Sequence, residues 1–445
     1  MNKEFHKKQN FFSFSDIDSE RKDRIMKFTS TEATPAPHVP PGVLRLTGAA
    51  KEDIPMYRIQ TMNKISPVGL NRFPSELYEV GDAVQDPQGI LVRSAKLLDL
   101  EFNPSLLAIA RAGVGVNNIP LDRCAAAGIP GFSTPGANAN AVKELVICAM
   151  LMGSRDIPGA IRWVREQAAS GVDVSTVVEK GKSAFIGPEL YKKTLGIIGL
   201  GAIGSIVANT AISLGMDVYG YDPFLSVDTA LRLDRHVHVV KDINDLYKRS
   251  DYITMHIHYT EKTARMIDAS AIAAMKRGVR VINLARGEIV DDEAMLTALD
   301  TGMVAAYITD FPNNRLLLTA PHVIAMPHLG ASTPESEQNC AAMAVDTLRD
   351  YLESGNIRSS VNLPEMTMDR SGVQRLCVLH KNVPGMLANI TSLFGRDGVN
   401  VENLSNKSRG DYAYTMVDLG SKVGDNVIED VRRTANVIRV RSLEW

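Results

Sequence analysis

The stretch LGIIGLGAIG, residues 195–204, decides the fold of this chain. Its apolar start predicts a β-strand, and its interleaved glycines predict a tight turn into a helix that ends at Gly215. The run VYGY at 218–221 predicts a second strand, which delivers Asp222 at its end. A strand, a glycine turn, a helix and a second strand that ends in an acid are the parts of a dinucleotide-binding βαβ unit.

This unit predicts NAD as the cofactor. Glycines let the backbone approach a pyrophosphate, which then faces the free N–H groups of a helix N-terminus. A carboxylate at Asp222 accepts hydrogen bonds from the adenosine ribose and repels a 2′-phosphate, which favours NAD over NADP. An ordinary strand–turn–helix, with glycines kept for packing, is the alternative. The expected cofactor contacts in the turn are Gly199, Gly201, Ala202, Ile203 and Gly204.

Composition limits the class of protein. A length of 445 residues suggests about three domains, and 45% hydrophobic with 22% charged residues is typical of a globular protein. The net charge of −2 gives no reason to expect nucleic acid. Apolar runs stay short of the 18 or so residues that a membrane span needs. Four scattered cysteines without a CxxC pair favour a reduced, cytoplasmic setting.

The order of patterns along the chain predicts the domains. Residues 1–54 are polar and end in several prolines, which predicts a disordered extension; a start codon assigned too early is the alternative. Strands that alternate with helices predict a doubly wound parallel α/β sheet, and the central place of the βαβ unit predicts that one domain is inserted into another. We expect a discontinuous, flavodoxin-like substrate domain at 56–153 and 327–363, a Rossmann NAD domain at 154–326, a polar linker at 364–372, and an α+β module with the order βαββαβ at 373–445.

Finer patterns predict individual elements. Helical periodicity predicts one helix over 153–167 and a long helix over 334–354. Histidines 236 and 238, and likewise 256 and 258, have the spacing that places two side chains on one face of a strand. They lack a Cys, Asp or Glu at ligand spacing, so we expect no metal site.

Two side chains are candidates for the chemistry. In open α/β sheets, ligands bind beyond the carboxyl ends of the strands, and the apolar run at 281–285 ends there in Arg286. A guanidinium at that position suits a carboxylate held bidentately, although Arg286 could instead cap the helix that begins near Asp291. His328 follows an apolar strand and precedes a Gly-Ala-Ser-Thr turn. An imidazole can accept a proton near neutral pH, so His328 is a candidate base or, equally, a structural residue.

These motifs together resemble the D-isomer-specific 2-hydroxyacid dehydrogenases. The resemblance rests on the glycine turn, NLARGEIVD (283–291) and PHLGAST (327–333), and further on ILVRSAKL (90–97), RAGVGVNN (111–118) and NANAVKEL (138–145). It implies that Arg286 binds the substrate carboxylate and that His328 takes the hydroxyl proton. It also implies cofactor contacts at Ala285 and Asp310, the latter to the nicotinamide amide, and substrate contacts at Arg93, Ser94, Val114, Gly115 and Asn138.

The chain departs from this family at one point. The resemblance implies a Glu a few residues beyond Asp310 that supports the catalytic His, but no acid occurs between Asp310 and His328. An Asn amide could orient the ring, but it supplies no charge to stabilise an imidazolium.

The last module, residues 373–445, resembles an ACT domain, a small-molecule sensor of amino-acid biosynthetic enzymes. The resemblance implies L-serine as effector, bound by His380, Asn382 and Asn400, in a homo-oligomer that is a tetramer or a dimer. These polar residues could also serve only as caps and turns. The resemblance as a whole implies the oxidation of a phosphorylated 2-hydroxy acid at the entry to serine synthesis. The alternatives are a relative that acts on 2-oxoglutarate or glyoxylate, and a serine sensor whose catalysis has decayed.

Overall fold

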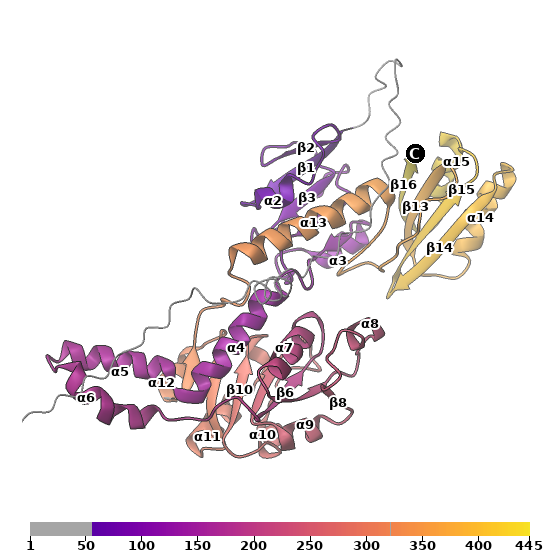
Figure 1. The fold of residues 1–445 in the computed structure, drawn as a ribbon. Coiled ribbons are helices and arrows are strands. Elements are labelled where there is room, and N and C mark those ends of the chain that lie inside the picture. The colour runs from indigo at the N-terminus through magenta and orange to yellow at the C-terminus, as the bar shows by residue number, and fades with distance from the viewer. Residues whose placement is uncertain (1–55, 321) are drawn as a thin grey trace, which may run out of the picture. The chain divides into compact units, whose positions relative to one another are not determined.

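The computed structural model describes residues 56–320 and 322–445, which form three sheets (Figure 1). The extension expected at residues 1–54 lies outside this part of the chain. The strand ranges of the three sheets are 57–132, 194–325 and 374–444. The exact domain boundaries expected above stay a prediction.

The first sheet has the order β2-β1-β3-β4-β5, with all neighbours parallel. This is the flavodoxin-like order of doubly wound folds, as expected. Its long helix α13 (Pro334–Ser354) packs on the sheet, and Figure 1 shows this helix in orange beside the first strands. The other elements are β1 (Tyr57–Met62), α2 (Pro67–Leu70), β2 (Tyr78–Gly81), β3 (Gly89–Val92), β4 (Ala108–Arg111), α3 (Leu121–Ala126) and β5 (Gly131–Phe132).

The second sheet contains the glycine turn and has seven parallel strands in the order β12-β11-β10-β9-β6-β7-β8. Taken in chain order, this is the Rossmann arrangement with one further strand at the edge. The strands are β6 (Thr194–Ile198), β7 (Asp217–Tyr221), β8 (His238–Val240), β9 (Tyr252–Met255), β10 (Val279–Asn283), β11 (Val304–Thr309) and β12 (Val323–Ala325). The helices are α4 (Ala139–Arg155), α7 (Ala202–Ser213), α8 (Val227–Ala230), α9 (Ile243–Arg249), α10 (Ala269–Ala273), η2 (Gly287–Ile289), α11 (Asp292–Asp300) and α12 (Asn314–Thr319).

The helix expected over 153–167 is present from residue 157 onward, but its expected start is wrong, because Asp156 separates it from the preceding helix. Helix α4 ends at Arg155, Asp156 has a φ of 39°, and α5 (Ile157–Ala169) begins immediately afterwards. The Asp156 side chain caps α5 by accepting from Gly159 N at 3.1 Å. Pro158 has no N–H to donate, so it fits the first turn of a new helix and not the interior of a continuous one. Helix α6 (Val174–Gly181) and the short η1 (Lys182–Phe185) follow, and like α5 they bury no residue.

The third sheet is antiparallel in the order β14-β15-β13-β16. Together with two helices it has the expected order βαββαβ, which fits an ACT-like domain. One sheet face packs on those helices through Leu376, Val378 and Val417. Along each strand, the side chains that alternate with these three point to the opposite face of the sheet. The elements are β13 (Gln374–Lys381), α14 (Met386–Arg396), β14 (Val401–Arg409), β15 (Tyr412–Leu419), α15 (Asp425–Arg433) and β16 (Val437–Glu444).

That opposite face is buried against other parts of the chain. Cys377, Leu379 and Tyr414 belong to the same hydrophobic core as Tyr351 and Leu352 of α13. The Tyr414 hydroxyl donates to Gly355 O at 2.7 Å. The C-terminal module therefore shares a core with the end of α13.

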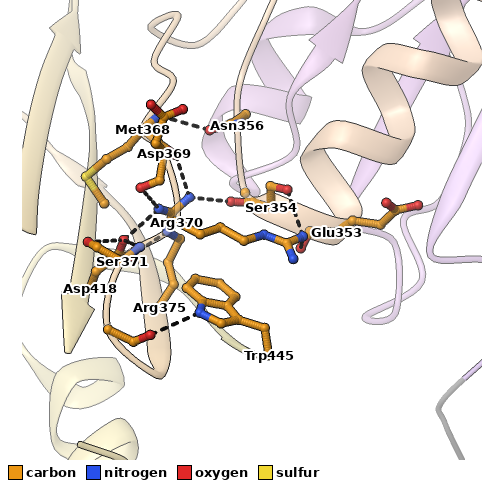
Figure 2. Close-up of polar contacts among 12 residues, drawn as sticks. Glu353, Ser354, Asn356, Met368, Asp369, Arg370, Ser371, Arg375, Asp418 and Trp445 are labelled. Carbon is orange, nitrogen blue, oxygen red and sulfur yellow. Dashed lines mark hydrogen bonds and ion pairs between the residues drawn. The ribbon is translucent and has the colours of Figure 1, made fainter. Parts of the chain in front are cut away.

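A buried ion pair reinforces this junction (Figure 2). Arg375 donates through Nε and Nη2 to the two carboxylate oxygens of Asp418 at 2.6 and 2.7 Å, and both side chains are fully buried. The remaining guanidinium N–H groups donate to the backbone carbonyls of Ser354, Met368 and Asp369. All five donors of Arg375 are thus satisfied, and they join the end of α13, the segment 364–372 and the module.

The expectation of a polar linker at 364–372 describes its composition but not its packing. Met366 and Met368 are buried, and Met366 exchanges two backbone hydrogen bonds with Ile357. The terminal Trp445 lies over Arg375 and donates its indole N–H to Gly372 O at 3.2 Å. Residues 364–372 are therefore held by contacts near both of their ends.

Candidate active site

The glycine turn after β6 has the shape that a pyrophosphate needs. Gly199 has a φ of 90°, and a Cβ there would lie 2.6 Å from His256 O. A Cβ at Gly204 would lie 1.9 Å from Gly199 O, so a side chain would break the turn. A Cβ at Gly201 would meet nothing within 4 Å, so the turn is open on that side. Ala202 and Ile203 form the first turn of α7, whose N–H groups face the opening.

Asp222 follows β7 and lies beside this turn. Its Oδ2 accepts from Leu200 N and its Oδ1 from Phe224 N, both at 2.9 Å. The two bonds fix the carboxylate, and each oxygen keeps a lone pair for a ribose hydroxyl. The donors and acceptors around the turn therefore fit NAD.

Arg286 follows β10, next to the buried Ala285. Buried Asn283 holds its backbone by donating to Arg286 O at 2.8 Å, and the Arg286 side chain donates to Ala285 O at 2.6 Å. The cap of α11 is Asp291, whose carboxylate accepts from Glu293 N and Ala294 N. The structure thus gives Arg286 no part in that cap.

His328 lies in the segment between β12 and α13, and its ring packs on the ring of Phe311. The ring centroids are 4.6 Å apart at an angle of 49°. The guanidinium carbon of Arg286 lies 5.6 Å from the same Phe311 ring. Phe311 therefore lies against both candidate catalytic side chains.

Asp310 directly follows β11 and is buried, only 2% exposed. Within residues 56–320 and 322–445, no side chain donates a hydrogen bond to either of its carboxylate oxygens. Burial raises the pKa of the Asp310 carboxyl, while nearby His328, the backbone N–H groups of Gly330 and Asp310, and the charge of Arg286 oppose that rise. A buried acid without a side-chain partner is suited to receive an amide N–H from a ligand.

The substrate residues expected after β3 are already engaged by other groups. The Arg93 guanidinium pairs with Glu337 of α13 at 2.5 Å. Ser94 N donates to Asn63 Oδ1 at 3.1 Å. Asn138 precedes α4, and its buried Oδ1 has no partner among the described residues.

The structure adds Arg111, which sequence reasoning missed. A Cβ at Gly115, in the loop with Val114 after β4, would lie 3.0 Å from Arg111 Nη1 and 3.4 Å from Arg286 Nη2. Both guanidinium groups therefore lie at this loop. Burial lowers the pKa of Arg111, and the charges of Arg286 and Arg93 lower it further. The available signal was an arginine that ends a buried strand, which is the same signal that singled out Arg286.

The three expected effector residues do not meet within one chain. His380 is buried in β13, and its ring nitrogens lie 2.8 Å from Lys381 O and Thr415 Oγ1. Asn382 donates to Gly410 O at the same end of the sheet. Asn400 lies at the other end, because β14 and β15 start from the Val401–Leu419 pair and end at the Arg409–Tyr412 pair. Eight residues of strand separate the two ends by about 26 Å.

Comparison with known proteins agrees with this geometry. Residues 147–330 match the family described as D-isomer specific 2-hydroxyacid dehydrogenase, NAD binding domain. D-3-phosphoglycerate dehydrogenase from Escherichia coli is 31% identical over 82% of this chain and 89% of its own length. The same enzyme from Synechocystis is 36% identical over 72% of this chain, which spans just 56% of that relative. An NAD⁺-bound 3-phosphoglycerate dehydrogenase of Entamoeba histolytica superimposes with a TM-score of 0.52 at 25% identity, covering 69% of this chain and 99% of its own.

The chain therefore belongs to the D-isomer-specific 2-hydroxyacid dehydrogenases, which confirms the resemblance seen in the motifs. Within that family, the curated proteins that it matches include D-3-phosphoglycerate dehydrogenases of several organisms. The expected NAD-binding Rossmann domain is confirmed as well.

Proposed function

We propose that this protein oxidises D-3-phosphoglycerate to 3-phosphohydroxypyruvate with NAD, at the entry to L-serine synthesis. The observation that carries the proposal is that the guanidinium groups of Arg111 and Arg286 both reach Gly115, with His328 and Asp310 near Arg286. Two guanidinium groups that reach one point repel each other and are balanced by anions. A 2-hydroxy acid with a second anionic group, such as a phosphate, provides two anions: its carboxylate and that second group.

Each side chain then has a role. Arg286 holds the substrate carboxylate and polarises the reacting C–O bond. Neutral His328 accepts the hydroxyl proton while the hydride leaves C2. Bound NAD supplies the acceptor for that hydride. Asp310 accepts from the nicotinamide amide. Arg111, Arg93 and the Ser94 N–H together hold the substrate phosphate. To do so, Arg93 leaves its ion pair with Glu337 and binds the phosphate instead.

The test is NADH formation from D-3-phosphoglycerate compared with D-glycerate and D-2-hydroxyglutarate. A strong preference for the phosphorylated acid, lost in His328→Asn, is the expected result. Higher activity on the unphosphorylated acids, or on glyoxylate in the reverse direction, would favour another member of the family. NADH binding without turnover of any acid would favour decayed catalysis.

We further propose that L-serine regulates the enzyme at a contact between two copies. Within one chain Asn400 lies about 26 Å from the Asn382 end of the sheet. Strand β14 is an edge strand of nine residues, and a second β14 paired with it antiparallel would bring each Asn400 to the other copy's Asn382 end. Serine needs acceptors for its ammonium and hydroxyl groups and donors for its carboxylate, and Asn amides supply both.

A homo-oligomer is supported by a second surface. Helices α5 and α6 bury no residue, yet they expose Ile161, Val164 and Val178. Apolar faces of this kind are typical of interfaces between subunits. Sedimentation at working concentration tests for a dimer or tetramer, and a monomer would contradict both the oligomer and the shared serine site.

We propose a reducing compartment, the cytoplasm, as the location. The four cysteines, Cys124, Cys148, Cys340 and Cys377, all lie in the described part of the chain and are free thiols. Among the described residues, no helix is long and apolar enough to cross a membrane.

A further inference from the structure

His328 lacks a polar partner for its ring in the described part of the chain. The hydrogen bond at this residue uses its backbone oxygen, which accepts from Ser332 Oγ at 3.5 Å. From Asp310 to His328 the sequence contains no further acid. If His328 takes a proton during the reaction, the imidazolium must be stabilised by groups other than a hydrogen-bonded carboxylate.

Phe311 is held where it can provide that stabilisation. Its backbone N–H donates to buried Thr309 Oγ1 at 3.0 Å, and Pro312 restricts the backbone directly after it. A Cβ at Gly287 would touch the Phe311 Cβ at 3.4 Å, so the ring is packed against the Arg286–Gly287 turn. Its position is therefore set by β11 and by the turn after β10, and not by the segment of His328.

The ring contacts His328 at 4.6 Å and the Arg286 guanidinium at 5.6 Å. An aromatic face carries partial negative charge and attracts a cation that lies on it. A neutral imidazole gains far less from this contact than an imidazolium does. The contact therefore places an aromatic ring against His328 and restricts the rotation of the imidazole.

The charged groups near His328 have opposite effects. Asp310, directly after β11, has the charge that attracts an imidazolium, and Arg286, from the turn after β10, has the charge that repels one. On the following helix, Glu335 and Glu337 lie in the first turn, and Glu337 is paired with Arg93. No side chain among the described residues donates to Asp310, and the backbone N–H of Gly330 stabilises its carboxylate.

We propose that Phe311 is a positioning residue of the active site, which holds His328 and Arg286 on its ring. This contact stands in this chain where the family has a carboxylate hydrogen-bonded to the base. This inference rests on the proposed dehydrogenase activity for its kinetic test, but not for its spectroscopic test.

The kinetic test compares Phe311→Leu, Phe311→Tyr and the unmodified protein. Leucine keeps the apolar bulk without the aromatic face, so kcat should fall about tenfold, on the scale of a misplaced general base. The acid limb of kcat/KM should move about half a pH unit lower, as expected for the loss of one cation–π contact. The KM for NAD should stay within about twofold, and Phe311→Tyr should restore kcat and the pH profile. Leu318→Ala, at an exposed position of the same segment, is the matched control.

The spectroscopic test follows the His328 ring by NMR of histidine-labelled protein, with His328→Asn for the assignment. A measured His328 pKa about half a unit lower in Phe311→Leu supports the proposal even if the protein turns over none of the acids tested. An unchanged His328 pKa overturns it even if the proposed activity is found. A pH profile identical in Phe311→Leu and the unmodified protein also overturns it.

Discussion

Replacing Arg375 by methionine leaves the buried carboxylate of Asp418 without its cation, and we expect this to unfold the C-terminal module at much lower denaturant. Asp418 would keep only the N–H and hydroxyl of Ser371, both bonded to its Oδ2. The carbonyls of Ser354, Met368 and Asp369 would lose their donors as well. Breaking a fully buried pair by removing one partner costs about 3–5 kcal/mol, a large share of the roughly 5–15 kcal/mol that stabilises a typical protein.

The chain itself supplies the reporter for this experiment. It contains two tryptophans, and Trp445 lies over Arg375 with 5.3 Å between the guanidinium carbon and the ring centroid. In a Trp163→Phe background, urea unfolding followed by fluorescence therefore reports on this junction alone. The matched control is Arg433→Met, which removes an exposed ion pair with Glu429 and should cost less than about 1 kcal/mol.

The comparison of the two variants decides the question. If Arg375→Met lowers the free energy of unfolding no more than Arg433→Met does, the reasoning is refuted. That result would mean that the buried ion pair contributes no more to stability than an exposed one. If Arg375→Met fails to fold, Asp418→Asn provides the same comparison, because it keeps the shape of the side chain and removes the charge.

Four further predictions follow from the site and the module. Asp222→Ala should raise the use of NADP relative to NAD, measured as the ratio of kcat/KM values, and an unchanged ratio would contradict the ribose contact. Arg111→Met should raise the KM for D-3-phosphoglycerate about tenfold or more while leaving that for NAD unchanged, since a charged hydrogen bond is lost. Asn400→Ala should abolish serine inhibition and keep uninhibited turnover; calorimetry that detects no serine binding to the unmodified protein would end that idea. Burial lowers the pKa of His256 to about 3, so the unfolded chain binds a proton that the folded chain does not as the pH falls from about 6.5 to 3. His256 should therefore lower the free energy of unfolding by about 1.4 kcal/mol for each pH unit between about 6.5 and 3. In His256→Asn, the free energy of unfolding should fall less steeply over the same pH range.

The sequence predicted most where local pattern decides the outcome. The long helix expected over 334–354 has those bounds in α13, because a Thr cap and a proline start it and Gly355 ends it. The glycine turn and Asp222 also lie where expected, since both follow from strand ends.

Features that depend on distant parts of the chain escaped prediction. Arg375 and Asp418 are 43 residues apart, and nothing local distinguishes a charge that finds a partner in the core from one that faces water. The distance between Asn400 and Asn382 follows from strand register, which motif spacing does not reveal. The break at Asp156 was local, but it depends on a left-handed residue that periodicity does not detect.

The core shared by the module and the end of α13 bears on how the chain can be shortened. Cutting before residue 373 would remove Cys377, Leu379 and Tyr414 from a core that also contains Tyr351 and Leu352. The apolar surface left behind would be open to water and prone to aggregation. The residues before 373 thus share part of their core with the C-terminal module, and we expect a shortened chain to need new polar residues on that face.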